Sequence, residues 1–454
     1  MKKTENYIKE NREKFLKDLF HIIAIPSISA EAAHKPDMIK CAEAIAAELV
    51  RSGADTAKAM PTSGNPVVFA SKIIDSTKPT VLVYGHYDVM PIAPANLWES
   101  DPFKAEVRND KIYARGADDD KGQSFMHIKA FEAMVKSDEL PCNVKFMIEG
   151  EEEIGSPSLE AWCQANKEML KADIILVSDT SMISLQTPTI TVGLRGLSYM
   201  EVTVKGASHD LHSGLFGCEV ANPINVLSKM IASLTDENGR VTIPGFYDDV
   251  RILSDDERIA ISKTPFDEKA YTESLEITDV VGETGYSTLE RTGTRPALDV
   301  NGIWGGHTGE GTKTVIASEA KAKISMRLVP NQQNDKIAQL FTDHFKKIAP
   351  SGVTVDVQYL HGGLPYVSPM SMHAYKAAEK AIETTFGISP LPFYSGGSIP
   401  IISVFERVLG IKSILIGFGL GGDNIHSPNE NFPLENFYKG IETIPYFYKY
   451  FTKQ

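Results

Sequence analysis

The chain has 454 residues, of which 42% are apolar and 23% are charged, and its formal net charge is -13. This length allows two domains with large hydrophobic cores. The acidic balance argues against nucleic acid and anionic membranes as partners, because both bind to positively charged surfaces.

The cysteines and the N-terminal segment indicate the compartment. Cys41, Cys142, Cys163 and Cys218 form no CxxC pair, so they are typical of free thiols in a reducing compartment and not of a metal site. The N-terminal segment starts with charged residues and lacks the apolar core of a signal peptide. No apolar run is long enough to cross a bilayer. We therefore predict a soluble, cytoplasmic protein with no membrane partner.

In the first part of the chain, short apolar runs alternate with helical patterns. Strands that alternate with helices favour a largely parallel sheet that is covered by helices on both faces. The predicted elements, in chain order, are a helix at 37–52 ended by Gly53, a strand at 79–84, a helix at 122–137, and strands at 143–148 and 172–178.

The pattern changes near residue 191 and returns near residue 366. Within this insertion, alternating apolar residues and one helical pattern predict α+β structure, while the polar stretch 248–294 gives no readable pattern. The sequence therefore predicts an α/β fold. Its larger domain, with a mostly parallel-stranded sheet, is formed by residues 1–190 and 366–454, and a smaller α+β domain is formed by residues 191–365.

Loops with potential metal ligands follow four of the predicted strands. The carboxyl ends of such strands meet at one edge of an open α/β sheet, where ligands bind. A single histidine or acidic loop is usually structural or solvated, but scattered surface acids would not select several strand ends at once. The residues are His86 and Asp88, Glu151–Glu153, Asp179 and His426, with Asp118, Asp119 and Asp120 in a fifth loop.

The types of side chain in these loops indicate which ions they suit. Imidazole and carboxylate without thiolate favour zinc, manganese or cobalt. Three ligand carboxylates and one carboxylate that acts as a base would balance the four charges of two divalent ions.

These loops resemble the aminoacylase/carnosinase family of dinuclear zinc peptidases, and within it the cytosolic non-specific dipeptidase branch. The matching motifs are YGHYDVMP, RGADDDKG, EGEEEIGS, SDT, DLHSG, KTVI, RLVPN, GGSIP and HSPNE, in the family's order from about residue 81 to 430. The resemblance implies a metal-dependent hydrolase that cleaves the amide bond of dipeptides or small peptides. It also implies two divalent metal ions per subunit, zinc first and manganese or cobalt as alternatives, and a homodimer in which the inserted domain serves as lid and dimerisation domain.

The resemblance assigns five residues to the metal centre. His86 and Asp179 would bind one ion, Glu153 and His426 the other, and Asp119 would bridge both. Three consecutive aspartates precede Lys-Gly in this chain, and counting back from the lysine selects Asp119. In the family the peptide bond after this aspartate is cis.

The resemblance also assigns three residues to catalysis. Glu152 would be the general base, taking a proton from a water that the ions acidify and passing it to the leaving amine. Asp88 would orient the ring of His86. His212, in the DLHSG motif, would reach the active site of the partner subunit and stabilise the oxyanion.

Four further residues match positions that hold the terminal carboxylate of the substrate: Thr314, Arg327, Gly397 and Ser398. An arginine is suited to this task because its planar fork binds a carboxylate bidentately. Ser395 stands where family dipeptidases often have Glu, which puts recognition of the substrate's amino end in question. An alternative is therefore an N-acyl or N-carbamoyl amino acid amidohydrolase on the same scaffold. A non-enzymatic interaction protein is disfavoured by the intact ligand set.

Overall fold

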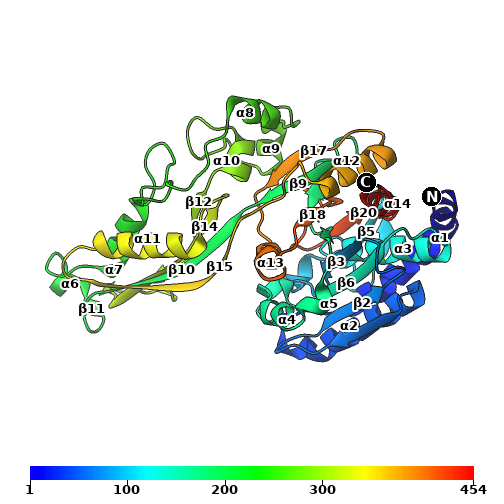
Figure 1. The fold of residues 1–454 in the computed structure, drawn as a ribbon. Coiled ribbons are helices and arrows are strands. Elements are labelled where there is room, and N and C mark those ends of the chain that lie inside the picture. Colours follow the sequence, from blue (N-terminus) through cyan, green and yellow to red (C-terminus); the bar gives the residue numbers. More distant parts are fainter. Residues whose placement is uncertain (454) are drawn as a thin grey trace. The chain divides into compact units, whose positions relative to one another are not determined.

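The structure is a computed structural model that describes residues 1–453. It divides into two compact units, and Figure 1 labels many of their elements. Unit 1 comprises Met1–Val192, Ser368–Phe393 and Val404–Gln454, and unit 2 comprises Gly193–Val367 and Tyr394–Ser403. The short segment Tyr394–Ser403 is thus grouped with unit 2, although the sequence suggested the larger domain. The assignment of the units as catalytic and lid or dimerisation domains stays a prediction.

The large sheet has parallel strands at its centre. Its order is β1-β2-β6-β3-β7-β18-β9-β16, and β17 also pairs with β9. The central strands β6, β3, β7 and β18 are parallel, while β1, β2, β9 and β16 add antiparallel pairs at the flanks. The predicted α/β fold is confirmed. The strands are β1 (Thr56–Met60), β2 (Val67–Lys72), β3 (Thr80–His86), β6 (Asn143–Glu149), β7 (Ile174–Val177), β9 (Thr189–Leu194), β16 (Tyr366–Val367), β17 (Leu391–Ser395) and β18 (Ser413–Leu415).

Both faces of this sheet are covered, as β3 shows. A side chain at Gly85 would collide with Ser124 of α3, so α3 packs closely on one face. The ring of Tyr84 points to the other face, where it packs edge-on against Phe405. The helices of unit 1 are α1 (Lys2–Ile23), α2 (Lys35–Ser52), α3 (Lys121–Lys136), α4 (Leu159–Ala165), α5 (Lys167–Leu170), α12 (His373–Phe386) and α14 (Leu434–Phe451), and α13 (Pro400–Val404) crosses the unit boundary.

Shorter elements of unit 1 carry the loops between these strands and helices. They are η1 (Ala32–His34), η2 (Ala95–Leu97), β4 (Glu106–Arg108), β5 (Lys111–Tyr113), η3 (Glu152–Ile154), β8 (Ser181–Met182), η4 (Phe405–Leu409), β19 (Gly419–Leu420) and β20 (Asn431–Pro433).

Unit 2 is built on an antiparallel sheet of order β12-β14-β10-β15. One face is apolar because alternate residues such as Met200, Val202 and Val204 of β10 point into a core shared with α7 and α11. The other face is polar and carries Arg327 of β14. The elements are β10 (Gly196–Lys205), β11 (Leu211–His212), α6 (Ser213–Phe216), α7 (Pro223–Ala232), β12 (Ala297–Gly305), β13 (Val315–Ile316), β14 (Glu319–Leu328), α11 (Asn334–Lys347) and β15 (Thr354–Gly363).

The polar stretch of unit 2 that the sequence left unread forms three short helices, α8 (Asp255–Ser262), α9 (Glu268–Ser274) and α10 (Thr288–Thr294). Two of them begin with a capping box, in which Ser254 pairs with Glu257 and Ser287 pairs with Glu290.

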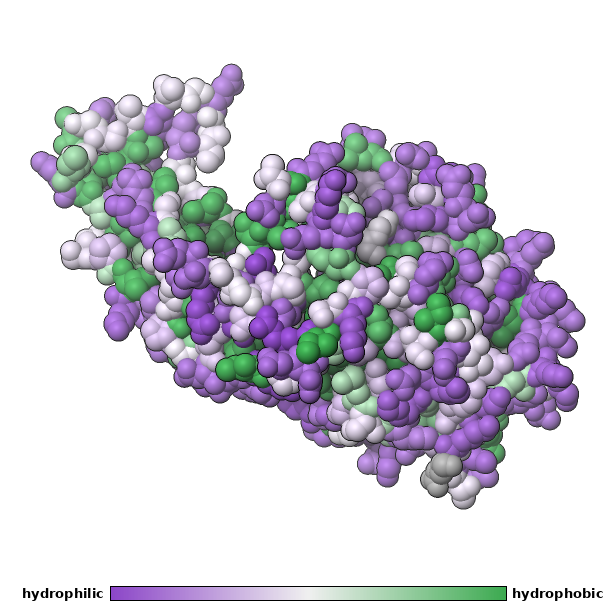
Figure 2. All heavy atoms as spheres, turned by 90° about the horizontal axis from the view of Figure 1, so that it is seen from above, coloured by the Kyte–Doolittle hydropathy of each residue, from purple (hydrophilic) through white to green (hydrophobic). Residues whose placement is uncertain are grey.

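The surface is mainly hydrophilic in the view of Figure 2, with hydrophobic residues scattered among polar ones. Among residues 1–453, no helix has both the length and the apolar character needed to span a membrane.

Candidate active site

The candidate metal ligands of unit 1 are positioned by adjacent strands. The parallel strands β6, β3, β7 and β18 are neighbours in that order, so the loops after them lie next to one another. His86 is the last residue of β3, and Asp179 follows the end of β7 by two residues. His426 lies further along its loop, beyond β19, and not directly after β18. His86 and Asp179 therefore lie at strand ends as the sequence predicts, whereas His426 lies farther from its strand than predicted.

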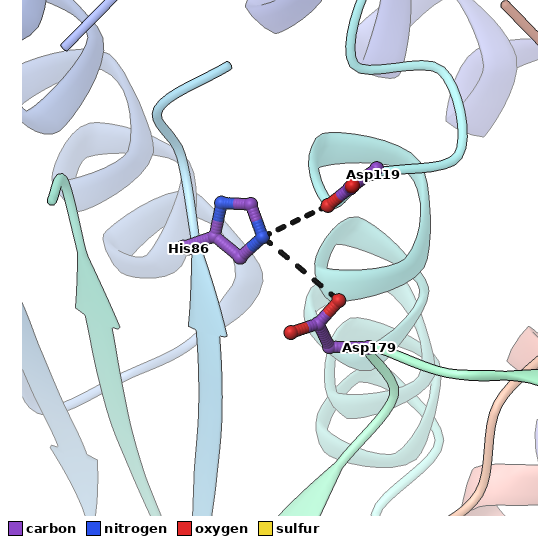
Figure 3. Close-up of side chains that lie close together, drawn as sticks. All are labelled: His86, Asp119 and Asp179. Carbon is purple, nitrogen blue, oxygen red and sulfur yellow. Dashed lines mark hydrogen bonds and ion pairs between the residues drawn. The ribbon is translucent and has the colours of Figure 1, made fainter. Parts of the chain in front are cut away.

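One group of potential ligands consists of His86, Asp119 and Asp179, which point toward one another in Figure 3. The His86 Nε2 atom lies 3.0 Å from Asp119 Oδ1 and 3.9 Å from Asp179 Oδ1. The other ring nitrogen, Nδ1, is 3.0 Å from the backbone oxygen of Asp88. This contact leaves Nε2 to face the two carboxylates.

A second group consists of Asp119, Glu153 and His426. The His426 Nε2 atom lies 3.0 Å from Asp119 Oδ2 and 3.2 Å from Glu153 Oε2. Asp119 therefore turns one oxygen to each histidine and belongs to both groups. Asp118 does not take this place, because its carboxylate is buried and accepts a hydrogen bond from Gln123. The peptide bond after Asp119 is cis, as the resemblance implies.

The electrostatics of these groups favour positive charge. Hydrogen bonds to Asp119 and Glu153 raise the pKa of His426 to about 10, against the effect of burial. Burial and nearby carboxylates raise the pKa of Asp179 well above its usual range. Burial also opposes ionisation of Asp119, but hydrogen bonds from both histidines lower its pKa. A cluster in which carboxylates accumulate in this way is stabilised by cations.

The ligand set fits two divalent metal ions. Each of the two groups brings its potential ligand atoms within 4.8 Å of one another. Oε1 of Glu153 is buried and has no hydrogen-bond partner among residues 1–453, so it is available to a cation. Imidazole and carboxylate ligands without thiolate suit zinc, manganese or cobalt.

Glu152 lies beside these groups, and Asp88 holds it in place. Asp88 Oδ1 accepts a hydrogen bond from the Glu152 backbone NH at 3.2 Å, and Oδ2 accepts one from the Glu153 NH at 3.1 Å. Burial, with contributions from Asp119 and Glu153, raises the pKa of Glu152 to about 7, although His86 acts in the opposite direction. The sequence suggested that Asp88 contacts His86. It did not reveal that the Asp88 carboxylate also accepts hydrogen bonds from the backbone NH groups of Glu152 and Glu153.

Two charged residues that the sequence analysis passed over support the Asp119 loop. Glu430 Oε1 accepts hydrogen bonds from the backbone NH groups of Asp118 and Asp119 at 3.0 and 3.1 Å. Its Oε2 accepts from Arg115 Nη1 at 2.7 Å, and both side chains are fully buried. In the sequence, Glu430 is the last residue of the HSPNE motif, and Arg115 is the first residue of the RGADDDKG motif. Neither motif indicates that the two side chains meet.

In unit 2, Arg327, Gly397 and Ser398 lie together. Arg327 Nη1 donates to Ser398 Oγ at 2.8 Å. The Gly397 backbone NH donates to Ser395 Oγ at 3.1 Å. Ser395 therefore stabilises its own loop.

His212 and Thr314 form a second group in unit 2. They are exposed and lie side by side where β11 pairs with β13, and the backbone NH of Ser213 donates to the Thr314 oxygen at 3.1 Å. His212 Nδ1 accepts a hydrogen bond from the Gly214 NH at 3.0 Å, which leaves Nε2 free for another partner.

The length of β14 separates His212 and Thr314 from the group formed by Arg327, Gly397 and Ser398. Arg327 lies near one end of β14, while β13 precedes the other end at Glu319. The eight residue-to-residue steps of extended strand from Glu319 to Arg327 span roughly 27 Å. A dipeptide is about 7 Å long, so it cannot contact Arg327 and His212 of one chain at the same time.

The chain matches the model of Peptidase family M20/M25/M40 over residues 82–449. It belongs to this peptidase family. The chain is 33% identical over 451 residues to the Cys-Gly metallodipeptidase dug1 of Schizosaccharomyces pombe, covering 96% of this chain and 95% of the relative. It is 32% identical to the Beta-Ala-His dipeptidase of Homo sapiens, covering 99% and 92%. The M20 family metallo-carboxypeptidase Sso-CP2 from Sulfolobus solfataricus has a solved structure with a TM-score of 0.87, 34% identity, and coverage of 97% and 99%.

These comparisons confirm the predicted family and enzyme class, a metal-dependent dipeptidase, and they do not favour the alternative amidohydrolase. The YXEP protein of Bacillus subtilis, a structural neighbour with 12% identity and a TM-score of 0.59, is described as a dinuclear metal-binding peptidase of the M20 family.

Proposed function

We propose that this M20 peptidase hydrolyses dipeptides with two metal ions held by His86, Asp119, Glu153, Asp179 and His426. The observation that carries the proposal is the carboxylate of Asp119, whose two oxygens lie 3.0 Å from His86 and His426. We propose zinc as the metal, with manganese or cobalt as alternatives, because the ligands are imidazole and carboxylate. When bound, the two ions would lower the pKa of a water in the site and polarise the amide carbonyl.

Glu152 is the general base of the proposed reaction. A carboxylate with a pKa near 7 can take a proton at neutral pH and return it to the leaving amine. Asp88 positions Glu152 through the backbone NH of that residue, so the base is held at a fixed place in its loop.

The terminal carboxylate of the substrate binds to Arg327, Ser398 and Gly397 in this proposal. Arg327 already donates to Ser398 and keeps further NH groups for an anion. The names of the relatives offer Cys-Gly and β-Ala-His as first candidate substrates. Ser395 supplies no negative charge for an amino end, so amino-end selectivity is expected to be broad.

His212 and Thr314 act on the partner subunit of a homodimer. The support is the length of β14, which keeps this pair from Arg327 of the same chain. His212 would donate a hydrogen bond to the oxyanion that develops on the substrate carbonyl. We further propose that the enzyme works in the cytoplasm.

Hydrolysis of a substrate panel by metal-free protein, with zinc or manganese added back, tests the function. The panel comprises Cys-Gly, β-Ala-His, two tripeptides and the matching N-acetyl and N-carbamoyl amino acids. We expect metal-dependent cleavage of the dipeptides. Cleavage of the N-substituted amino acids alone would contradict the proposal.

A mixing experiment tests the role of His212 in the partner subunit. Glu152→Gln and His212→Ala should each be inactive alone, and a hybrid dimer should regain activity because it contains one site with both residues intact. Hybrid dimers that are shown to form but stay inactive would contradict the proposal. Exposed His209 is the matched control, and His209→Ala should stay active alone.

A further inference from the structure

Within residues 1–453, three arginines of unit 2 form no ion pair with a carboxylate: Arg195, Arg291 and Arg327. Arg291 donates instead to the backbone oxygen of Glu283 at 3.1 Å. Arg327 bonds to Ser398 Oγ, and Arg195 bonds to the backbone oxygen of Gly396. Within residues 1–453, no carboxylate oxygen lies within 4.0 Å of the side-chain nitrogens of either arginine. By contrast, the buried Arg295 of the same unit forms an ion pair with Glu283 at 2.7 Å. Unpaired guanidinium groups at a half-buried place indicate a site for an anion.

Arg195 is fixed by the loop that carries Ser398. It stands between β9 and β10, and its backbone NH donates to the Gly397 oxygen at 2.9 Å. Its Nε donates to the Gly396 oxygen, also at 2.9 Å. A side chain at Gly396 would come within 3.2 Å of Arg195 Nη2, so this group lies directly against the loop. Among residues 1–453, the two Nη groups of Arg195 have no hydrogen-bond partner and are available to a ligand.

The charges of the two arginines act on each other. Burial and the nearby Arg327 lower the pKa of Arg195 to about 10, with Asp299 acting in the opposite direction. Arg195 is therefore still protonated at neutral pH. Two like charges at one half-buried place are unfavourable until an anion lies between or beside them.

We propose that Arg195 is a specificity-determining residue, which holds the Gly396–Ser398 loop and, with Arg327, selects substrates that end in a free carboxylate. The inference rests on the proposed function of Arg327. It goes beyond that function because it makes selection depend on two guanidinium groups and not one. A purely structural role for Arg195 would affect all substrates equally, whereas this role affects only those with a free carboxylate.

The test compares a dipeptide with the same dipeptide amidated at its carboxyl end. For Arg195→Gln, we expect the KM of the dipeptide to rise roughly 10- to 100-fold with kcat little changed, because a charge-assisted hydrogen bond is lost. The kinetics of the amide should stay as in the wild type. Arg195→Lys keeps the positive charge but loses the planar guanidinium, so its preference for the dipeptide over the amide should be intermediate. If Arg195→Gln does not fold, the result for Arg195→Lys decides the test.

Lys323→Gln is the matched control. Lys323 lies on the same strand and the same face as Arg327, four residues away, and removing its charge should leave the preference intact. An equal loss of rate on dipeptide and amide in the Arg195 variants would overturn the inference. So would an unchanged preference in Arg195→Gln when Arg327→Gln abolishes it. If Arg327→Gln also keeps the preference, the proposed carboxylate site itself is wrong.

Discussion

Two clusters of carboxylates in unit 1 have opposite ways of balancing their charge. The lysine cluster, formed by Asp18, Glu48 and Glu132 around Lys129, contains its own cation. The Lys129 ammonium is fully buried, donates to Asp18 at 2.6 Å and to Glu132 at 2.9 Å, and also bonds to Glu48. The metal cluster, defined by the five proposed ligands, contains no lysine or arginine and leaves Glu153 Oε1 without a partner among residues 1–453.

The difference shows that the grouping of acids alone does not define a metal site. Both clusters bring three potential ligand atoms within 4.8 Å. In the lysine cluster, hydrogen bonds to the ammonium satisfy the carboxylates, so a metal ion would have to displace it. In the metal cluster, the positive charge has to come from the histidines or from bound ions. Only the metal cluster is therefore expected to bind ions.

The largest expected effect is on catalysis at the metal cluster. Glu152→Gln should lower kcat by about 10²- to 10⁴-fold because the general base is lost. Both ions should stay bound, since Glu152 is not a proposed ligand. Steady-state rates and elemental analysis of the same preparation check both statements. Loss of an ion from this variant would mean that Glu152 and Glu153 have exchanged roles.

Removing the internal cation should mainly affect stability. Lys129→Met removes the buried cation that the three carboxylates share and should lower the free energy of unfolding by about 3–5 kcal/mol. Urea denaturation measures this change. Lys14→Met is the matched control, because Lys14 reaches Asp18 and Glu132 from the half-exposed surface and should cost under about 1 kcal/mol. Equal stability of both variants would show that Lys129 does not hold the cluster together.

Acid should weaken the lysine cluster. Hydrogen bonds and charge interactions with Lys129 lower the pKa of Asp18 and of Glu132, against the effect of burial. Because the folded-state pKa values are lowered, these groups contribute stability above their unfolded pKa values. The contribution is lost as the pH falls below about 4. Denaturation between pH 7 and pH 3 should show a steeper loss in the wild type than in Lys129→Met.

The smallest expected effect concerns the rim of the lysine cluster. The Tyr7 hydroxyl donates to Glu132 at 3.0 Å. Tyr7→Phe removes this hydrogen bond and leaves Glu132 paired with Lys129, so the free energy of unfolding should fall by about 1 kcal/mol. A loss comparable to that of Lys129→Met would show that the hydroxyl, and not the ammonium, is the main partner of Glu132.

The sequence allowed the parallel centre of the sheet and the ligand loops to be predicted because short apolar strands lead into His86 and Asp179. The support of these loops could not be predicted, since Arg115 and Glu430 are far apart in the chain and meet only in the fold. Helix α8 was missed although its capping box, Ser254 with Glu257, was visible as S-x-x-E. None of the residues of α8 is buried, so no periodic apolar pattern followed the capping box in the sequence.

The most direct test of the central claim is the number of zinc ions bound per chain, measured by elemental analysis of protein that is stripped of metal and reloaded. We predict two ions for the wild type, both at the metal cluster and none at the lysine cluster. Asp119→Asn should bind fewer, because Asp119 belongs to both groups of ligands. Two ions retained in Asp119→Asn, or none bound by the wild type, would contradict the account.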